Sequence, residues 1–352
     1  MDTLTHALGG ALLARATAPD PTTARISITA RVAAGAFGAA FPDADAVLAY
    51  VSPIAYLTGH RGVTHSLVLL PFWALLLAGL AAKVDRGKDR SWRDYFGVCA
   101  LAIGSHIVGD LITSFGTLIY APLSDARVAW GTTFIIDLWF SGIILAGLAA
   151  SWAWRRSRVP AVIGLAVLTS YVGLQAVLHS RAVDFGTEYA ERAGFHAARV
   201  SAIPRPVSPF NWMAVVVEGD RYRYANVNLL RQTMPPPAGA GFIARLDAAY
   251  APLALASWIA VDKYGADAGG RELAARVLAD PQLDFFRWFA DYPALYRIDR
   301  GNPATCVWFQ DLRFVIPGRD SNIFRFGLCD EQGGRGWRAF RLLDDGTRER
   351  AD

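Results

Sequence analysis

The sequence predicts a polytopic α-helical membrane domain with four or more spanning helices, followed by an α+β soluble domain with an antiparallel sheet. Hydrophobic residues make up 53% of the chain and charged residues only 19%, which is too apolar for a typical soluble enzyme. The long apolar runs lie in the first half, and strand-like segments lie in the second. We therefore expect a transmembrane domain over residues 1–180 and an extracytoplasmic domain over residues 181–352.

Four apolar segments reach or approach the ~20 residues that a spanning helix needs, at 67–82, 95–120, 133–154 and 159–178. Upstream, residues 32–41 are small and apolar but end at Pro42, so they fit a short spanning, re-entrant or half-buried helix. The first eighteen residues lack the basic start and the cleavage site of a signal peptide. We expect them to remain in the protein and to belong to its site.

Basic residues in the loops predict the orientation. Residues 83–93 contain Lys83, Arg86, Lys88, Arg90 and Arg93, and residues 155–158 contain three arginines, whereas residues 121–132 contain only Arg127. The first two loops should be cytoplasmic, and the chain after about His179 extracytoplasmic, in a multi-pass protein of the bacterial inner membrane. The net charge of +4 is small and the arginines are scattered, which argues against nucleic acid as a partner.

The second half alternates between strand and helix patterns. Residues 210–230 form a strand–turn–strand pattern around Gly219, and further strands are expected at 305–316, 322–328 and 337–343. Helical patterns cover 243–261, 270–278 and 281–289. Cys306 and Cys329 fall in two of the expected strands, so they can form a disulfide in an oxidising compartment or remain two buried thiols. Cys99 is expected to pack inside a spanning helix.

The strongest local motif is the pair His106 and Asp110 within an apolar helix. Residues four apart lie on the same helix face, so the imidazole and the carboxylate can bind one metal ion, or one can orient the other. A polar pair that stabilises helix packing is the alternative. Ionisable groups in a membrane domain are costly, and three further His or Asp motifs at the same expected depth favour the functional interpretation.

Two of those motifs lie upstream of this helix. His60 and His65 flank Arg61, so one histidine can be a ligand and the other a proton carrier, while the guanidinium can bind phosphate or carboxylate; a solvated loop is the alternative. Asp43 and Asp45 can bridge two metals or divide the roles of ligand and general base. A helix stop followed by an N-cap would explain the same two aspartates.

These motifs occur in an order that resembles the LexA-regulated, inner-membrane-associated metal-dependent hydrolases, the YdjM-like proteins, over roughly residues 1–180. The matching elements are Thr5-His6, Pro42-Asp43-Ala44-Asp45, His60-Arg61-Gly62-Val63-Thr64-His65-Ser66, Ser105-His106 through Asp110, Gly116-Thr117 and Ile136-Asp137. A more distant similarity is to zinc-dependent phospholipase C and the P1-type nucleases. That similarity implies ligands near His6, Asp43, His60 or His65, His106 and Asp110. The chain lacks their downstream His…His-x-x-x-Glu set, so one or two metal ions are expected instead of three.

We therefore expect a membrane-embedded metal-dependent hydrolase that uses metal-activated water on a lipid or lipid-linked phosphoester near the extracytoplasmic membrane surface. A divalent ion, zinc before others, would be bound by His6, Asp43, His65, His106 and Asp110. Asp45 or His60 would act as general base or support the ligands, and Arg61 would bind the anionic group of the substrate. The alternatives are a divalent-metal carrier or sensor and a non-catalytic membrane scaffold.

Overall fold

The structure, a computed structural model, describes residues 1–85, 91–235, 241–301, 304–319, 322, 324–330 and 336–351. Three basic residues of the expected cytoplasmic loop, Arg86, Lys88 and Arg90, lie outside the described residues. The chain divides into two compact units. The first consists of Met1–Ala46 and Gly59–Val177, and the second of Val47–Thr58 and Leu178–Asp352.

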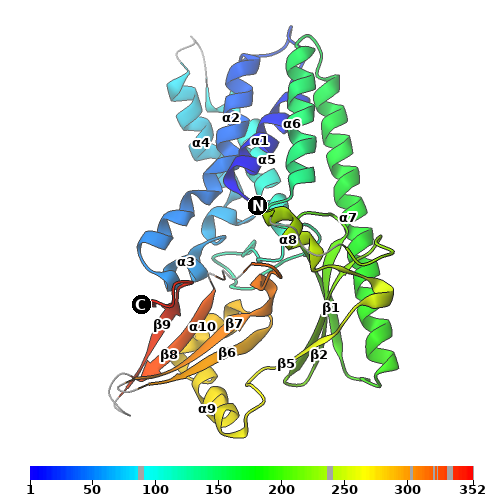
Figure 1. Ribbon diagram of the computed structural model, residues 1–352. Coiled ribbons are helices and arrows are strands. Elements are labelled where there is room, and N and C mark those ends of the chain that lie inside the picture. Colours follow the sequence, from blue (N-terminus) through cyan, green and yellow to red (C-terminus); the bar gives the residue numbers. More distant parts are fainter. Residues whose placement is uncertain are drawn as a thin grey trace. The chain divides into compact units, whose positions relative to one another are not determined.

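The first unit is a bundle of helices (Figure 1). Asp2 and Ser27 cap the first two helices, because their side chains accept hydrogen bonds from the backbone N–H groups of Thr5 and Ala30. The helices are α1 (Thr3–Ala16), α2 (Ile28–Ala40), α4 (Leu70–Val84), α5 (Trp92–Leu111), α6 (Leu138–Ala153) and α7 (Val159–Arg192), whose last part belongs to the second unit.

Glycine lets α1 and α2 approach closely. A Cβ atom on Gly35 would lie 2.6 Å from the carbonyl oxygen of Gly10, and one on Gly10 would overlap the carbonyl oxygen of Gly35. Small residues at such a crossing are typical of helix pairs in membranes. The crossing fixes α1 against α2, which in turn contacts α5.

Two helical segments among the described residues are long and apolar enough to cross a membrane, Ile28–Tyr50 and Val159–Arg192. A third is possible if the bent pair Pro53–His65 and Leu70–Val84 forms one span, and α6 is a shorter apolar helix. The helical, apolar first half is therefore as expected. The expected count of four or more spans stays a prediction.

One expected span is shorter than the apolar run that suggested it. Instead of continuing to residue 120, α5 ends at Leu111, and the Oγ1 of Thr113 donates back to the carbonyl of Asp110 at 2.8 Å. Gly116 then adopts φ +94°, which a right-handed helix cannot contain. Residues 112–137 instead form an irregular segment in which Thr117 pairs with Val128.

The second unit contains two five-stranded sheets, one of which has the order β1-β2-β3-β4 with β5 also on β3. All its pairs are antiparallel except β3 with β4. The strands are β1 (Arg199–Pro204), β2 (Asn211–Glu218), β3 (Arg221–Asn228), β4 (Ala251–Pro252) and β5 (Ile259–Asp262). The expected turn at Gly219 is present, with φ +57°.

The other sheet is antiparallel throughout, in the order β10-β9-β8-β7-β6. Its strands are β6 (Pro293–Arg300), β7 (Thr305–Asp311), β8 (Arg325–Asp330), β9 (Trp337–Leu342) and β10 (Arg348–Arg350). Cys306 on β7 lies directly opposite Cys329 on β8, and the two form a disulfide. Cys99 is a buried free thiol in α5.

The prediction of one helix over residues 243–261 is wrong for the second half of that range. The chain forms α8 (Phe242–Ala248) and then the strands β4 and β5. Pro252 explains the break, because its ring restricts Ala251 to extended conformations. The other two helical patterns become α9 (Ala268–Leu278) and a short turn followed by α10 (Asp284–Phe289).

Candidate metal centre

Four buried side chains of the helical unit, Asp43, His65, His106 and Asp110, bring one ligand atom each within 4.8 Å of one another. Asp43 lies on the 3-10 helix η1 (Phe41–Tyr50), just after α2, and His65 ends the short 3-10 helix η2 (Val63–His65). His106 and Asp110 lie one turn apart on α5. Segments far apart in sequence thus present nitrogen and carboxylate ligands to one point.

The spacing of these atoms suits a small divalent ion. The Nε2 atoms of His65 and His106 are 2.9 Å apart, and they lie 3.2 and 3.5 Å from Oδ2 of Asp110. The same two nitrogens lie 3.8 and 3.6 Å from Oδ1 of Asp43. Ligands bound at ~2.0–2.2 Å around a tetrahedral ion are about 3.4 Å apart. The set therefore needs only tenths of an ångström of adjustment to bind such an ion.

Backbone geometry fixes which nitrogen of His106 carries the proton. Its Nδ1 lies 2.6 Å from the carbonyl oxygen of Ala39, at the end of α2. A carbonyl oxygen can only accept, so Nδ1–H is the donor. The lone pair of a neutral His106 is therefore on Nε2, directed at the other three ligands.

His65 is oriented through its neighbour. The hydroxyl of Thr64 donates to Oδ2 of Asp45 at 2.7 Å, so its oxygen can accept the Nδ1–H of His65 at 3.0 Å. Nδ1 also lies 3.3 Å from the same carboxylate oxygen. The Nε2 atom of His65 is thus left as the ligand atom, and it faces the corresponding atom of His106.

Asp45 supports this arrangement from outside the group of four. It accepts hydrogen bonds from Nδ1 of His60 at 2.7 Å and from the backbone N–H of Arg61 at 3.0 Å, in addition to the hydroxyl of Thr64. With both oxygens engaged, the carboxylate holds the His60–His65 segment in place. These contacts suit a positioning role better than that of a general base.

The two oxygens of Asp110 have different surroundings. Oδ1 lies 2.9 Å from Nη2 of Arg61 and 3.1 Å from Nε2 of His6, and it also contacts the amino group of Met1. Oδ2 is directed at the two histidine ligands and accepts no hydrogen bond from the described residues. One oxygen therefore anchors the side chain, and the other is available to an ion.

The site as a whole calls for a cation. Oδ2 of Asp43 and Oδ2 of Asp110 are buried without hydrogen-bond partners among the described residues, and two histidine lone pairs point at each other. Such an arrangement is costly unless a positive charge lies between the groups. A divalent metal satisfies all four ligands; a second proton on one imidazole would satisfy fewer of them. The residues present fit a divalent metal ion.

The other expected site residues lie beside this group. His6 stacks on His106, with ring centroids 3.7 Å apart, but it is not among the four clustered ligands. Arg61 is only 1% exposed; its Nη1 donates to Thr113 at 2.8 Å, and its guanidinium lies over Phe115. Both side chains thus contact Asp110 or His106 directly, and the role of Arg61 toward an anionic substrate stays a prediction.

Some supporting residues were not singled out from the sequence. Thr113 and the carbonyl of Ala39 carry no motif of their own, and only the fold brings them to the site. Gly109 provides the space for His6, because a Cβ there would lie 3.0 Å from Cε1 of that ring. Asp137 is elsewhere: it caps α6 and accepts a hydrogen bond from Tyr171.

The fold and site define a helical membrane protein with a buried His/Asp centre that can bind a metal ion. Residues 1–182 match the family described as YdjM inner membrane protein; because this is more than half of the chain, the protein belongs to that family. It is also 30% identical over 183 residues to a Bacillus subtilis (strain 168) protein described as "Uncharacterized protein YfhP". That match covers 50% of this chain and 53% of YfhP, so the chain spans about half the length of this relative. No solved structure matches the chain, and no comparison supports the expected similarity to phospholipase C.

Proposed function

We propose that this protein is a membrane-embedded metal-dependent hydrolase that cleaves a phosphoester with metal-activated water. The observation that carries the proposal is the convergence of two histidine Nε2 atoms and two carboxylates, in which the Oδ2 atom of Asp110 faces both imidazoles without a hydrogen-bond partner among the described residues. A divalent ion, when bound, supplies a Lewis acid that polarises a phosphoryl oxygen and acidifies water. Zinc is the first candidate, because two imidazoles and two carboxylates at tetrahedral spacing suit it well.

The protein's own residues divide the remaining work. Asp43, His65, His106 and Asp110 would hold one ion. Thr64, Asp45 and the carbonyl of Ala39 fix the imidazole tautomers, and Arg61 holds Asp110 so that Oδ2 faces inward. Such supporting contacts commonly change metal affinity 10- to 100-fold.

His60 is the proposed proton acceptor. The carboxylate of Asp45 accepts from its Nδ1, which places the basic lone pair on Nε2. Its ring centroid is 5.9 Å from that of the ligand His65, and its side chain is 10% exposed, so it can exchange a proton with water near the site. This Asp–His pair has the arrangement that orients many general bases.

The proposed substrate is a membrane lipid or a lipid-linked phosphoester. Several apolar side chains on the segments that carry the ligands are 45–49% exposed: Val63, Leu67, Val68 and Val108. In an inner-membrane family, exposed apolar side chains of this kind suit contact with acyl chains. A phosphoester that resides in the bilayer can therefore reach the site without leaving the lipid.

The proposed topology is multi-pass with four or more spans, α4, α5, α6 and α7 among them, and with the second unit outside the cytoplasm. The arginines at 155–158 favour a cytoplasmic loop between α6 and α7, and the chain after α7 then lies on the other side. The disulfide Cys306–Cys329 supports this placement, because disulfides persist mainly in oxidising compartments.

Metal analysis combined with an activity assay tests the proposal. The full chain, purified in detergent and loaded with zinc, should bind about one ion and hydrolyse a phospholipid or a generic phosphodiester. A His60→Ala variant should keep the metal and lose most activity, whereas His106→Ala should lose both. The variant His196→Ala, outside the site, is the matched control.

The same experiment separates the alternatives. A metal carrier would move zinc across the membrane of a reconstituted vesicle without hydrolysis, and it would need ligands along a path to both faces. Among the described residues, the clustered His and Asp side chains that could bind a metal form a single site, and a carrier would need further sites along its path. A scaffold would bind no stoichiometric metal, and that result would overturn the proposal.

A further inference from the structure

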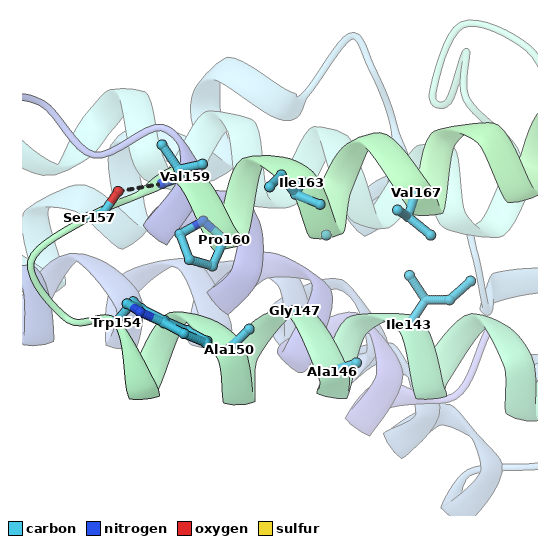
Figure 2. Close-up of a pocket in the computed structure, with 11 residues that line it drawn as sticks. Ile143, Ala146, Gly147, Ala150, Trp154, Ser157, Val159, Pro160, Ile163 and Val167 are labelled. Carbon is cyan, nitrogen blue, oxygen red and sulfur yellow. Dashed lines mark hydrogen bonds between the residues drawn. The ribbon is translucent and has the colours of Figure 1, made fainter.

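A groove of about 600 Å³ lies between α6 and α7 of the helical unit. None of its lining residues belongs to the metal centre. Figure 2 shows Trp154 and Pro160 toward the α6–α7 loop, and Ile143 and Val167 toward the other end. The remaining lining residues are Ala146, Gly147, Ala150, Ser157, Val159, Ile163 and Gly164.

The lining is apolar because of helical periodicity. On α6 the lining positions recur at spacings of three or four residues, which places them on one face. Gly147 and Gly164 bring the helices together: a Cβ on either would lie within 3.2 Å of the other's Cα. The only hydroxyl in the lining belongs to Ser157, and it already accepts from the backbone N–H of Val159 at 3.1 Å. The groove therefore offers an occupant apolar contact and almost no hydrogen bonding.

The loop at one end of this groove is strongly basic. It contains three exposed arginines, Arg155, Arg156 and Arg158, which lie in the sequence between the lining residues Trp154, Ser157 and Val159. Arg15 reaches the same loop, donating to the carbonyls of Arg155 and Ser157 at 2.7 and 2.8 Å. None of these four arginines forms an ion pair with a carboxylate among the described residues. Guanidinium groups bind phosphate oxygens well, often through two parallel hydrogen bonds.

We propose that this groove binds one acyl chain of an anionic phospholipid, whose phosphate group is bound by Arg155 and Arg156. Arg155 lies over the Trp152 ring and donates its Nε–H to the Trp152 carbonyl at 3.3 Å, which leaves its other N–H groups for a ligand. An apolar channel that ends at exposed guanidinium groups without carboxylate partners matches the two chemical parts of such a lipid. The protein belongs to an inner-membrane family, and basic residues next to spanning helices attract anionic lipids. The proposal does not depend on the metal centre or on its hydrolase activity.

A second copy of the chain suits the groove less well. A symmetric contact through the α6–α7 faces would bring two arginine-rich loops together at the same end of the bundle, and like charges there would repel. An anionic lipid instead neutralises the loop. The charge of the loop therefore favours lipid as the occupant.

Native mass spectrometry of the full chain in detergent tests the proposal, with phosphatidylglycerol and phosphatidylcholine of identical acyl chains as probes. The wild type should retain one phosphatidylglycerol and bind phosphatidylcholine clearly less well. Arg155→Gln and Arg156→Gln should each weaken phosphatidylglycerol binding about fivefold, as expected for one charge near a membrane surface. Lys83→Gln, an exposed basic residue at the end of α4, is the charge control and should change nothing.

A second pair of variants tests the groove itself. Ala150→Phe places a ring in the groove and should reduce phosphatidylglycerol binding at least fivefold. Ala149→Phe adds the same bulk on α6 at an exposed position outside the groove lining and should leave binding unchanged. Equal binding of the two lipids, or full binding by Ala150→Phe, would overturn the proposal. A stable dimer that dissociates in Ala150→Phe would instead identify a second copy as the occupant.

Discussion

His106 donates its Nδ1–H to the carbonyl oxygen of Ala39, 2.6 Å away, and this bond joins α5 to the end of α2. Asp43 follows four residues later, so the same contact that orients one ligand also places the segment carrying another. The ligand set is thus built by helix packing as much as by the motif residues. This relationship guides the predictions about metal binding.

His106→Ala and Asp110→Ala should each abolish stoichiometric metal binding while the protein stays inserted in the membrane. Each removes a ligand atom from the group of four. Metal content after purification, measured by atomic emission, checks the outcome, with His179→Ala as a control in the second unit. If both variants keep wild-type metal content, the metal assignment is wrong.

Thr64→Val should lower metal affinity 10- to 100-fold and leave the fold intact. The substitution keeps the shape of the side chain but removes the hydroxyl that links His65 to Asp45. Competition with a chelator of known affinity measures the change. Thr169→Val removes a hydroxyl that bonds only to its own helix, at the carbonyl of Leu165, and should have no effect.

Arg61→Ala should destabilise the protein by about 3–5 kcal/mol, because it leaves a buried carboxylate without its guanidinium partner. Arg61 and Asp110 are both almost fully buried, and they are 2.9 Å apart. Chemical unfolding in detergent measures the loss, and Arg93→Ala, an exposed arginine at the start of α5, should cost less than about 0.5 kcal/mol. If the Arg61→Ala variant is as stable as the wild type, binds metal and has lost affinity for the substrate, Arg61 binds the substrate and does not stabilise the fold.

Cys306 and Cys329 should react with a membrane-impermeant thiol reagent on intact spheroplasts only after reduction in moderate urea, because both sulfur atoms are buried in the folded second unit. That result follows if their disulfide lies outside the cytoplasm, whereas Cys99, a buried thiol within α5, should stay unlabelled. Replacing both cysteines with serine should lower stability by about 3 kcal/mol, a typical value for a loop of this size. Labelling that requires an opened inner membrane would invert the proposed topology.

Gly10→Ala should destabilise the helical unit by about 1–3 kcal/mol, because the added methyl group overlaps the backbone of Gly35. The neighbouring Gly9→Ala is a matched control, since its Cβ would make an ordinary 3.7 Å contact with Ile144. That variant should be neutral or slightly stabilising. Thermal unfolding of the two variants in the same detergent measures the difference.

The sequence predicted the helices and the ligand types well because both depend on local pattern. The apolar runs mark α4, α6 and the first part of α7, and the i, i+4 spacing places His106 and Asp110 on one face. The end of α5 was missed because the apolar run continues past Leu111, while the features that end the helix, the contact of Thr113 with the Asp110 carbonyl and the positive φ of Gly116, are conformational. Pro252 is a signal in the sequence for the break after α8, but the apolar residues around it led to the prediction of one continuous helix.

The division of roles within the site could not be read from the sequence. Asp43 and Asp45 are two residues apart in the same motif, yet one faces the ligand cluster and the other accepts three hydrogen bonds behind it. That difference depends on how η1 is turned against η2 and α5. The contact of Arg61 with Asp110 depends equally on packing between segments 49 residues apart.

Arg61 also has an unusual backbone, with φ 60°, in the left-handed region that most side chains avoid. For a residue other than glycine this conformation costs about 1–2 kcal/mol, so the surrounding contacts must hold it there. The N–H of Arg61 bonds Asp45, and its side chain bonds Asp110, so one strained residue connects both carboxylates. Glycine at position 61 would adopt this φ without strain and would keep the backbone bond to Asp45, but it would lose the side-chain contact with Asp110. The conformation that the backbone prefers and the contacts that the site needs therefore favour different residues at position 61.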